Sequence, residues 1–253
     1  MKTLGVDLAA QPKKTAACVI DWVENEAQVI TLEVGVDDPR ILSLAGTMTK
    51  GTDWTGIDSP FGWPVTFSQM IAAHDAGAGA IREWEKIWQR SLCYRLTDDY
   101  VRDSVGLNPQ SVSASWLAIV AMRCRGLLAE LRVKDRSGVD GVVEVYPAAA
   151  LRRWELIPAG FKGKKKGAGL TTLVEAVQTA TPWLCLPDAE KKLCATNHHA
   201  FDAVVCALVA RATALGLTER PGPDDLATAR REGWIALPYP GSLSKLPNGT
   251  PGH

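Results

Sequence analysis

The chain has 253 residues, of which 46% are hydrophobic and 22% charged. This is long enough to bury a substantial core and ordinary for a globular protein. The 28 basic and 28 acidic side chains cancel, so no overall field attracts nucleic acid or a membrane, and a local patch must hold any such partner. The six cysteines include no CxxC pair, which argues against a zinc site.

The first 60 residues predict three antiparallel strands and a parallel crossover. The segments TLGVDLAA, TAACVIDW and AQVITLEVG are short, apolar and separated by polar turns, as in a strand meander. A helix is predicted over 37–50, where acidic residues and Pro39 occupy the first turn. DWTGIDSP then predicts a fourth strand, which a strand–helix–strand step places parallel in the same sheet.

The rest of the chain is predicted to be mainly helical. Residues 66–108 read as a helical insertion, followed by a long amphipathic helix at SASWLAIVAMRCRGLLAELR and a fifth strand at GVVEVYP. Shorter helices and a basic loop, FKGKKKGAG, precede a final long helix that starts at NHHAFDAVVCALVA. We expect residues 1–240 to form a single domain and residues 241–253 to be a disordered tail.

This order of elements predicts an α/β fold of ribonuclease H-like type. We expect a mixed five-stranded sheet, with three antiparallel strands followed by two parallel ones, flanked by helices and carrying the helical insertion. No apolar run is long enough to cross a bilayer, and the N-terminus lacks the features of a signal peptide. A cytoplasmic protein without a membrane partner is the expectation.

Two aspartates end strands that this fold makes neighbours. Asp7 ends the first predicted strand and Asp58 the fourth. Each alone is typical of a turn aspartate. Parallel neighbours, however, end at the same edge of a sheet, where open α/β sheets hold their sites. Two carboxylates so close do not both ionise readily without a cation between them, so the pair indicates a metal site.

The last helix carries a third aspartate near its start. His198 and His199 precede Asp202 by four and three residues, so either histidine can share a helix face with it. The alternative is that Asn197 caps the helix, the histidines fray in its first turn, and Asp202 complements the helix dipole. Asp202 lies in the apolar run AFDAVVCALVA, where a free charge is costly, which favours a functional role.

These oxygens suit hard divalent ions. Carboxylates prefer Mg²⁺ or Mn²⁺, which keep several waters and accept substrate phosphate. Two such ions about 4 Å apart promote hydrolysis of a phosphodiester, and a histidine ligates a metal or moves a proton. Glu144, on the fifth strand, is a further candidate catalytic residue; the alternative is a strand-end glutamate paired with Arg152 or Arg153.

Several motifs together resemble the domain-of-unknown-function family 429, described as predicted nucleases of ribonuclease H fold. They are GVDLA, GIDSPFGWP, YRLTDDYVR, EVYPAA, HHAFDAVVCALVARA and EGWIALP, from about residue 3 to about residue 239. The resemblance implies that Asp7, Asp58 and Asp202 are metal ligands with His198 or His199 beside them. One departure is Asp58, because many nucleases of this fold carry the longer Glu on the fourth strand.

The last helix is also similar to that of Holliday-junction resolvases, which place a histidine and an aspartate on the corresponding helix. By resemblance to those dimeric enzymes, a homodimer is a possible state of this chain.

Other segments are candidates for substrate binding. Arg95 and Asp98 fit a phosphate-contacting role, or else a surface capping box at a helix start. Lys164 and Lys165, in the basic loop, could hold a nucleic-acid backbone, although charge runs are usually solvated loops. Tryptophans could stack bases, although at helical spacing they more often belong to the core; the candidates are Trp63, Trp84 and Trp88.

The sequence is therefore compatible with three functions. The leading one is a divalent-metal-dependent nuclease that acts on nucleic acid. The first alternative is an ATP-dependent phosphotransferase of the actin-like superfamily, but the chain has room for only one such domain and lacks the second Gly-rich phosphate loop. The second alternative is a non-catalytic binding module that retains the fold, which the zero net charge keeps open.

Overall fold

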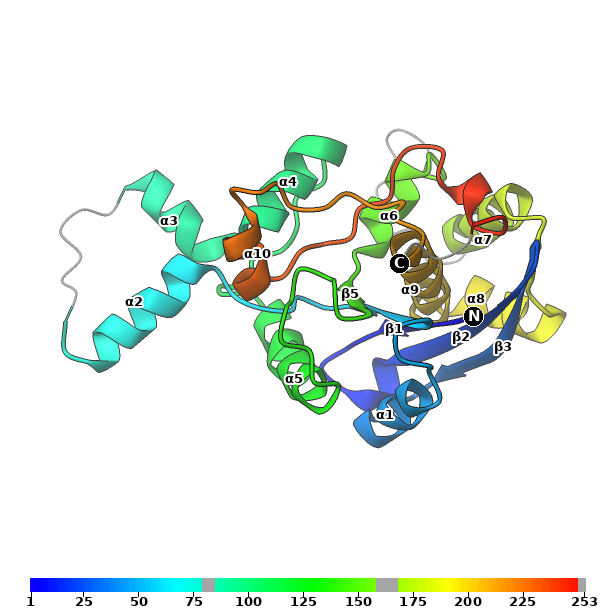
Figure 1. The fold of residues 1–253 in the computed structure, drawn as a ribbon, viewed down its shortest axis with the longest axis horizontal. Coiled ribbons are helices and arrows are strands. Elements are labelled where there is room, and N and C mark those ends of the chain that lie inside the picture. Colours follow the sequence, from blue (N-terminus) through cyan, green and yellow to red (C-terminus); the bar gives the residue numbers. More distant parts are fainter. Residues whose placement is uncertain (79–84, 158–167, 250–253) are drawn as a thin grey trace.

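A mixed six-stranded sheet forms the centre of the molecule. The computed structural model describes residues 1–78, 85–157 and 168–249. The strands lie in the order β5-β4-β1-β2-β3-β6 (Figure 1). β2 pairs antiparallel with both β1 and β3, whereas β1–β4, β4–β5 and β3–β6 are parallel pairs. The strands are β1 Lys2–Asp7, β2 Ala16–Val23, β3 Glu26–Val34, β4 Trp54–Asp58, β5 Val142–Glu144 and β6 Leu184–Cys185.

The three antiparallel strands, the crossover and the two further parallel strands are confirmed, but the prediction of five strands is wrong. The sixth strand, β6, is only two residues long and pairs with Ala27 and Gln28 of β3. A strand this short has no alternation of apolar and polar residues for a sequence pattern to detect. It lies in the short TPWLCLP segment between two helices.

Helices cover both faces of the sheet (Figure 1). One face carries α1 and α5, and the other carries α6, α7, α8 and α9, while α2 and α3 project away from the sheet. The helices are α1 Asp38–Gly46, α2 Val65–Asp75, α3 Lys86–Cys93, α4 Leu96–Val105, α5 Leu117–Glu130, α6 Pro147–Arg153, α7 Ala168–Ala180, α8 Asp188–Thr196, α9 His198–Ala214 and α10 Leu226–Glu232, with 3₁₀ turns at Pro12–Lys14 and Leu243–Lys245.

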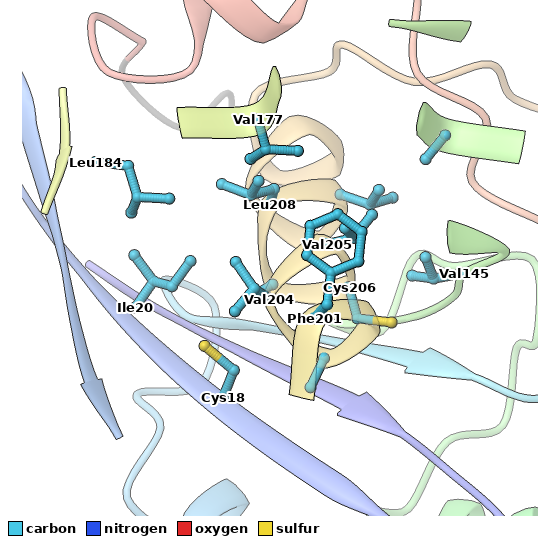
Figure 2. Packing of buried hydrophobic residues seen from close by; sticks show 14 of the residues in the cluster. Cys18, Ile20, Val145, Val177, Leu184, Phe201, Val204, Val205, Cys206 and Leu208 are labelled. Atoms are coloured by element: carbon cyan, nitrogen blue, oxygen red, sulfur yellow. The ribbon is translucent and has the colours of Figure 1, made fainter. Parts of the chain in front are cut away.

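Helix α9 lies in the largest hydrophobic core. Its apolar run is buried from Ala203 to Ala214, because it packs between the sheet and the outer helices. Figure 2 shows side chains of α9 between β2 of the sheet and the outer elements α7 and β6. They are Phe201, Val204, Val205 and Leu208 of α9, Cys18 and Ile20 of β2, Val177 of α7 and Leu184 of β6.

Two glycines let α9 touch the backbone of the sheet. Gly5 of β1 and Gly56 of β4 are register partners. A Cβ atom on Gly5 would lie 2.0 Å from the carbonyl oxygen of Ala203, and one on Gly56 would lie 2.5 Å from that of Cys206. Glycine in a strand interior marks such close backbone approach. The glycines therefore hold α9, and Asp202 with it, against the strands that end in Asp7 and Asp58.

The C-terminal segment differs from the expectation of disorder. Leu243 and Leu246 are buried, and the guanidinium of Arg211 donates hydrogen bonds to the carbonyl oxygens of Leu246 at 3.1 Å and Gly249 at 2.7 Å. A short polar sequence gives no local signal of such tertiary contacts. Residues 250–253 lie outside the described part of the chain. No single helix in the described ranges is long and apolar enough to cross a membrane.

Candidate functional site

Asp7 and Asp58 end adjacent parallel strands. They are direct register partners, the last residues of β1 and β4. The expectation that these two strand ends meet at one edge of the sheet is confirmed. Asp7 is 7% exposed, so its carboxylate is largely desolvated.

Helix α9 brings a histidine to this edge. The side-chain oxygen of Asn197 caps the helix by accepting hydrogen bonds from the backbone N–H groups of His199 at 3.0 Å and Ala200 at 3.3 Å. The His199 Nδ1 atom lies 2.5 Å from the Asp7 Oδ2 atom. The ring of His198 lies beside that of His199, 3.9 Å between centroids. The structure thus distinguishes two histidines that helical spacing left equivalent.

Asp7, Asp58 and Asp202 interact electrostatically, and we call these three the aspartate cluster. Burial raises the pKa of Asp58 well above its ordinary value, and the charges of Asp7, Asp202 and Glu144 raise it further. Burial and the charge of Asp7 likewise raise the pKa of Asp202. Within the described ranges, Asp58 and Asp202 have neither an ion pair nor a side-chain hydrogen bond. The cluster therefore holds more negative charge than its surroundings offset.

Two buried thiols border the aspartate cluster. Burial raises the pKa of Cys194 to about 12, and the charge of Asp202 adds to the rise. Burial also raises the pKa of Cys206, followed by the charges of Asp58, Asp7 and Asp202. Both thiols are therefore protonated at neutral pH and add no charge. Cys206 lies one helical turn after Asp202.

The donor atoms of the aspartate cluster suit a divalent cation. Carboxylate oxygens are the ligands that Mg²⁺ and Mn²⁺ prefer. In the part of the chain that the structure describes, no three His, Cys, Asp or Glu side chains are already arranged to hold a metal ion. The Asp7 oxygen instead contacts His199.

Glu144 has a partner of its own. Its carboxylate accepts a hydrogen bond from Arg95 Nη2 at 2.7 Å, and that same nitrogen lies 2.8 Å from Asp98. Arg95, Asp98 and Glu144 are each 2% exposed. The alternative partners named for Glu144 are wrong, because Arg153 pairs with Glu219 at 2.6 Å and the described structure gives Arg152 no ion pair.

Glu232 completes what we call the Arg95 cluster, which consists of Arg95, Asp98, Glu144 and Glu232. Its carboxylate accepts hydrogen bonds from the backbone N–H groups of Val65 at 2.6 Å and Leu96 at 2.8 Å. Its carbonyl accepts one from Arg95 at 3.1 Å. The motif EGWIALP places Glu232 near the end of the chain, and no local pattern connects it with residue 95.

Each carboxylate of the Arg95 cluster has hydrogen-bond donors, either the guanidinium of Arg95 or backbone N–H groups. Burial by itself would lower the pKa of Arg95, but the charges of Glu144 and Asp98 raise it overall. Burial raises the pKa of Glu144, while Arg95 and the N–H of Phe61, a 2.9 Å donor, oppose the rise. The predicted capping box is present, with the Arg95 N–H 2.9 Å from Asp98, but it is buried and not on the surface. Substrate contact by Arg95 and Asp98 stays a prediction.

The remaining candidates fall into two groups. Lys164, Lys165 and Trp84 lie outside the described residues, so their predicted contacts with nucleic acid stay predictions. Trp88 lies on the described helix α3, whereas Trp63 lies in the loop between β4 and α2.

The chain matches one family of known proteins. A family model described as "Protein of unknown function (DUF429)" matches residues 5–226. Neither the curated proteins nor the solved structures contain a match to the chain.

Proposed function

Because the chain belongs to the DUF429 family, whose description assigns no function, we propose from its own site that the protein is a divalent-metal-dependent nuclease. The observation that carries this proposal is the aspartate cluster. Its carboxylates come from β1, β4 and α9, and burial followed by the charge of Asp7 raises the pKa values of Asp58 and Asp202. Among the described side chains, no cation pairs with Asp58 or Asp202. Ionisable groups with perturbed pKa values of this kind cluster at functional sites.

The cluster fits Mg²⁺ or Mn²⁺ by the chemistry of its donors. Asp7, Asp58 and Asp202 would hold the ion, which supplies charge to stabilise the leaving oxygen of a phosphodiester. The preference of such ions for substrate phosphate makes nucleic acid the proposed partner. Because Asp58 and Asp202 lack hydrogen bonds to other described groups, their side chains are free to turn toward an ion.

The sheet supports the ribonuclease H-like part of the proposal. Strands β3-β2-β1-β4-β5 lie in the order expected for that fold, with the first three antiparallel and the last two parallel to β1. Strand β6 is an addition beyond β3. The site lies where strand ends meet, the usual location in open α/β sheets.

His199 is the proposed proton-transfer residue. Its Nδ1 atom faces Asp7 at 2.5 Å, which orients the ring and leaves Nε2 for a proton to or from water. Burial and the neighbouring charge of His199 lower the pKa of His198, and no described carboxylate orients its ring by a hydrogen bond. We therefore expect His199→Ala to slow hydrolysis about 10²- to 10⁴-fold, the range for a lost general base, and His198→Ala to slow it less.

The experiment is hydrolysis of labelled oligonucleotides with Mg²⁺ or Mn²⁺, using single strands, duplexes and four-way junctions. We expect activity with the metal and none in EDTA. Asp7→Asn, Asp58→Asn and Asp202→Asn should each abolish it and weaken Mn²⁺ binding in calorimetry. The matched control is Asp75→Asn, which changes an exposed aspartate of α2 and should leave both unchanged.

Three results would overturn the proposal. Hydrolysis that survives Asp58→Asn would show that another site or a contaminant cuts the strand. ATP hydrolysis without strand cleavage would favour a phosphotransferase, and absence of Mn²⁺ binding would favour a non-catalytic module. Light scattering, with and without oligonucleotide, tests for the homodimer that the resemblance to junction resolvases suggests.

A further inference from the structure

A basic pocket lies beside the loop that follows Asp58. Its volume is about 330 Å³. The walls come from the β4–α2 loop and α2, from the segment before β5, and from the end of α10. We call this the basic pocket; its lining residues are Trp63, Val65, Ser68, Lys134, Arg136, Arg230 and Arg231.

The pocket concentrates positive charge in a chain with no net charge. Four of its seven lining residues are cationic, and the chain as a whole carries 28 basic and 28 acidic side chains. Arg230 pairs with Asp135 at 2.9 Å. Among the described residues, no carboxylate lies within ion-pair distance of Lys134, Arg136 or Arg231. The pocket therefore attracts anions locally.

Main-chain contacts hold the cations in place. The Arg136 guanidinium donates a hydrogen bond to the Arg231 carbonyl at 2.7 Å, and the Arg136 backbone N–H donates to the Arg230 carbonyl at 3.4 Å. A guanidinium has five N–H donors, and in the described structure Arg136 uses one. The remaining donors suit the oxygens of a phosphate, which arginine binds through paired hydrogen bonds.

The β4–α2 loop connects the aspartate cluster with the basic pocket. Trp63 follows Asp58 by five residues, which span at most about 18 Å when extended. Burial raises the pKa of Cys124 to about 12, and a hydrogen bond with Ser59 and the charge of Arg136 oppose this rise. Gly62 makes room for α10, since a Cβ atom there would lie 2.5 Å from the Arg231 carbonyl oxygen. A strand of a few nucleotides can therefore reach from one to the other.

We propose that the basic pocket binds a backbone phosphate of single-stranded nucleic acid, with Trp63 as the surface on which the adjoining base stacks. Aromatic stacking combined with a basic groove is how proteins hold single strands of any sequence. This proposal deepens the proposed function, on which it rests for the position of the cleaved phosphate. The pocket would hold a phosphate a few nucleotides away from the one at the aspartate cluster.

The test is fluorescence anisotropy with a labelled single-stranded oligonucleotide in EDTA, so that no strand is cut. The variant K134Q/R231Q removes two exposed cations that form no ion pair among the described residues. We expect the slope of log affinity against log salt to fall by about 0.7 for each lost phosphate contact. Trp63→Leu should weaken binding about tenfold without changing that slope.

The matched control is K50Q/K245Q, which removes the same number of exposed charges. Lys50 precedes β4, at the opposite end of that strand from Asp58. The control should keep the wild-type salt slope, and circular dichroism should show that all variants are folded. An unchanged slope in K134Q/R231Q, or an equal change in the control, would overturn the proposal.

Three further results distinguish a strand-binding pocket, a site for small phosphate compounds and the nuclease itself. Inorganic phosphate that displaces the oligonucleotide at equal phosphate concentration would identify a site for small phosphate compounds and overturn the strand assignment. Binding that depends on the basic pocket, in a protein that never cleaves, would support the pocket and overturn the nuclease. Cleavage by a protein whose strand binding does not depend on the basic pocket would support the nuclease and overturn the proposal for the pocket.

Discussion

The molecule contains two groups of buried acids, and they differ in how their charge is offset. In the Arg95 cluster, Glu144 and Asp98 share one buried guanidinium at 2.7 and 2.8 Å, and backbone N–H groups serve Glu232. In the aspartate cluster, His199 contacts Asp7, and the described structure offers Asp58 and Asp202 no such partner. The two clusters are neighbours, since the charge of Glu144 reaches Asp58.

This difference separates a structural role from a functional one. A complete ion-pair network ties together segments far apart in the chain, here the β4–α2 loop, the start of α4, β5 and the end of α10. An incomplete one lowers stability and persists where a ligand supplies the missing charge. The acidic residues that end the neighbouring strands β4 and β5 therefore have opposite expected responses to mutation.

The largest effect is expected where α9 touches the sheet. Gly5→Ala places a Cβ atom 2.0 Å from the Ala203 carbonyl oxygen and 2.4 Å from the Ala207 nitrogen. Both are backbone atoms, so the helix itself must move, and we expect a loss of at least about 4 kcal/mol of unfolding free energy. Urea unfolding measures it. The control Gly46→Ala, at the end of α1 with open space around it, should be neutral or stabilising; equal losses would contradict the close approach.

The next largest effect is expected in the Arg95 cluster. Arg95→Met leaves Glu144 and Asp98 buried without their cation, and breaking a buried pair in this way costs about 3–5 kcal/mol. Urea unfolding should show this loss. The control is Arg40→Met, which breaks an exposed pair with Glu33 at 2.6 Å and should leave the urea midpoint nearly unchanged, because exposed ion pairs add little stability. A mild effect of Arg95→Met would mean that the network is not structural.

Changing one acid to its amide should shift the free energy of unfolding in opposite directions in the two clusters. Asp58→Asn removes a charge that its neighbours repel, and we expect a gain of about 0.5–2 kcal/mol with loss of activity. Glu144→Gln deprives Arg95 of a carboxylate and should destabilise the protein by about 1–3 kcal/mol. Denaturant midpoints at neutral pH without metal compare the two. If both variants lose stability equally, the clusters do not differ as described.

The smallest expected effect is on how the free energy of unfolding varies with pH. The pKa values of Asp58 and Asp202 are raised in the folded chain, so in this region the folded state binds more protons than the unfolded one. Their contribution to stability therefore falls as pH rises from the ordinary carboxyl pKa, about 3.9, through the raised values. Urea midpoints across this range should fall less steeply for D58N/D202N than for the wild type. Mg²⁺ should flatten the wild-type profile, and parallel profiles without metal would contradict the assignment.

The amino-acid sequence alone predicts the order of the principal elements and the edge of the sheet that holds the aspartates. Short apolar runs separated by tight polar turns predict β1, β2 and β3, and a strand–helix–strand step has one allowed hand. This topology places Asp7 and Asp58 at one edge of the sheet, and the structure shows that they are register partners. The Asn197 cap and the start of α9 follow equally from local chemistry.

Which charged side chains come into contact depends on long-range packing. Residues 95, 144 and 232 converge through long-range packing, which leaves no local pattern, and the same is true of the lining of the basic pocket. The two-residue strand β6 and the packed segment 241–249 depend on neighbours far away in the chain. His199 and not His198 faces Asp7 because Gly5 and Gly56 fix how α9 lies on the sheet, and helical spacing carries no information about that rotation.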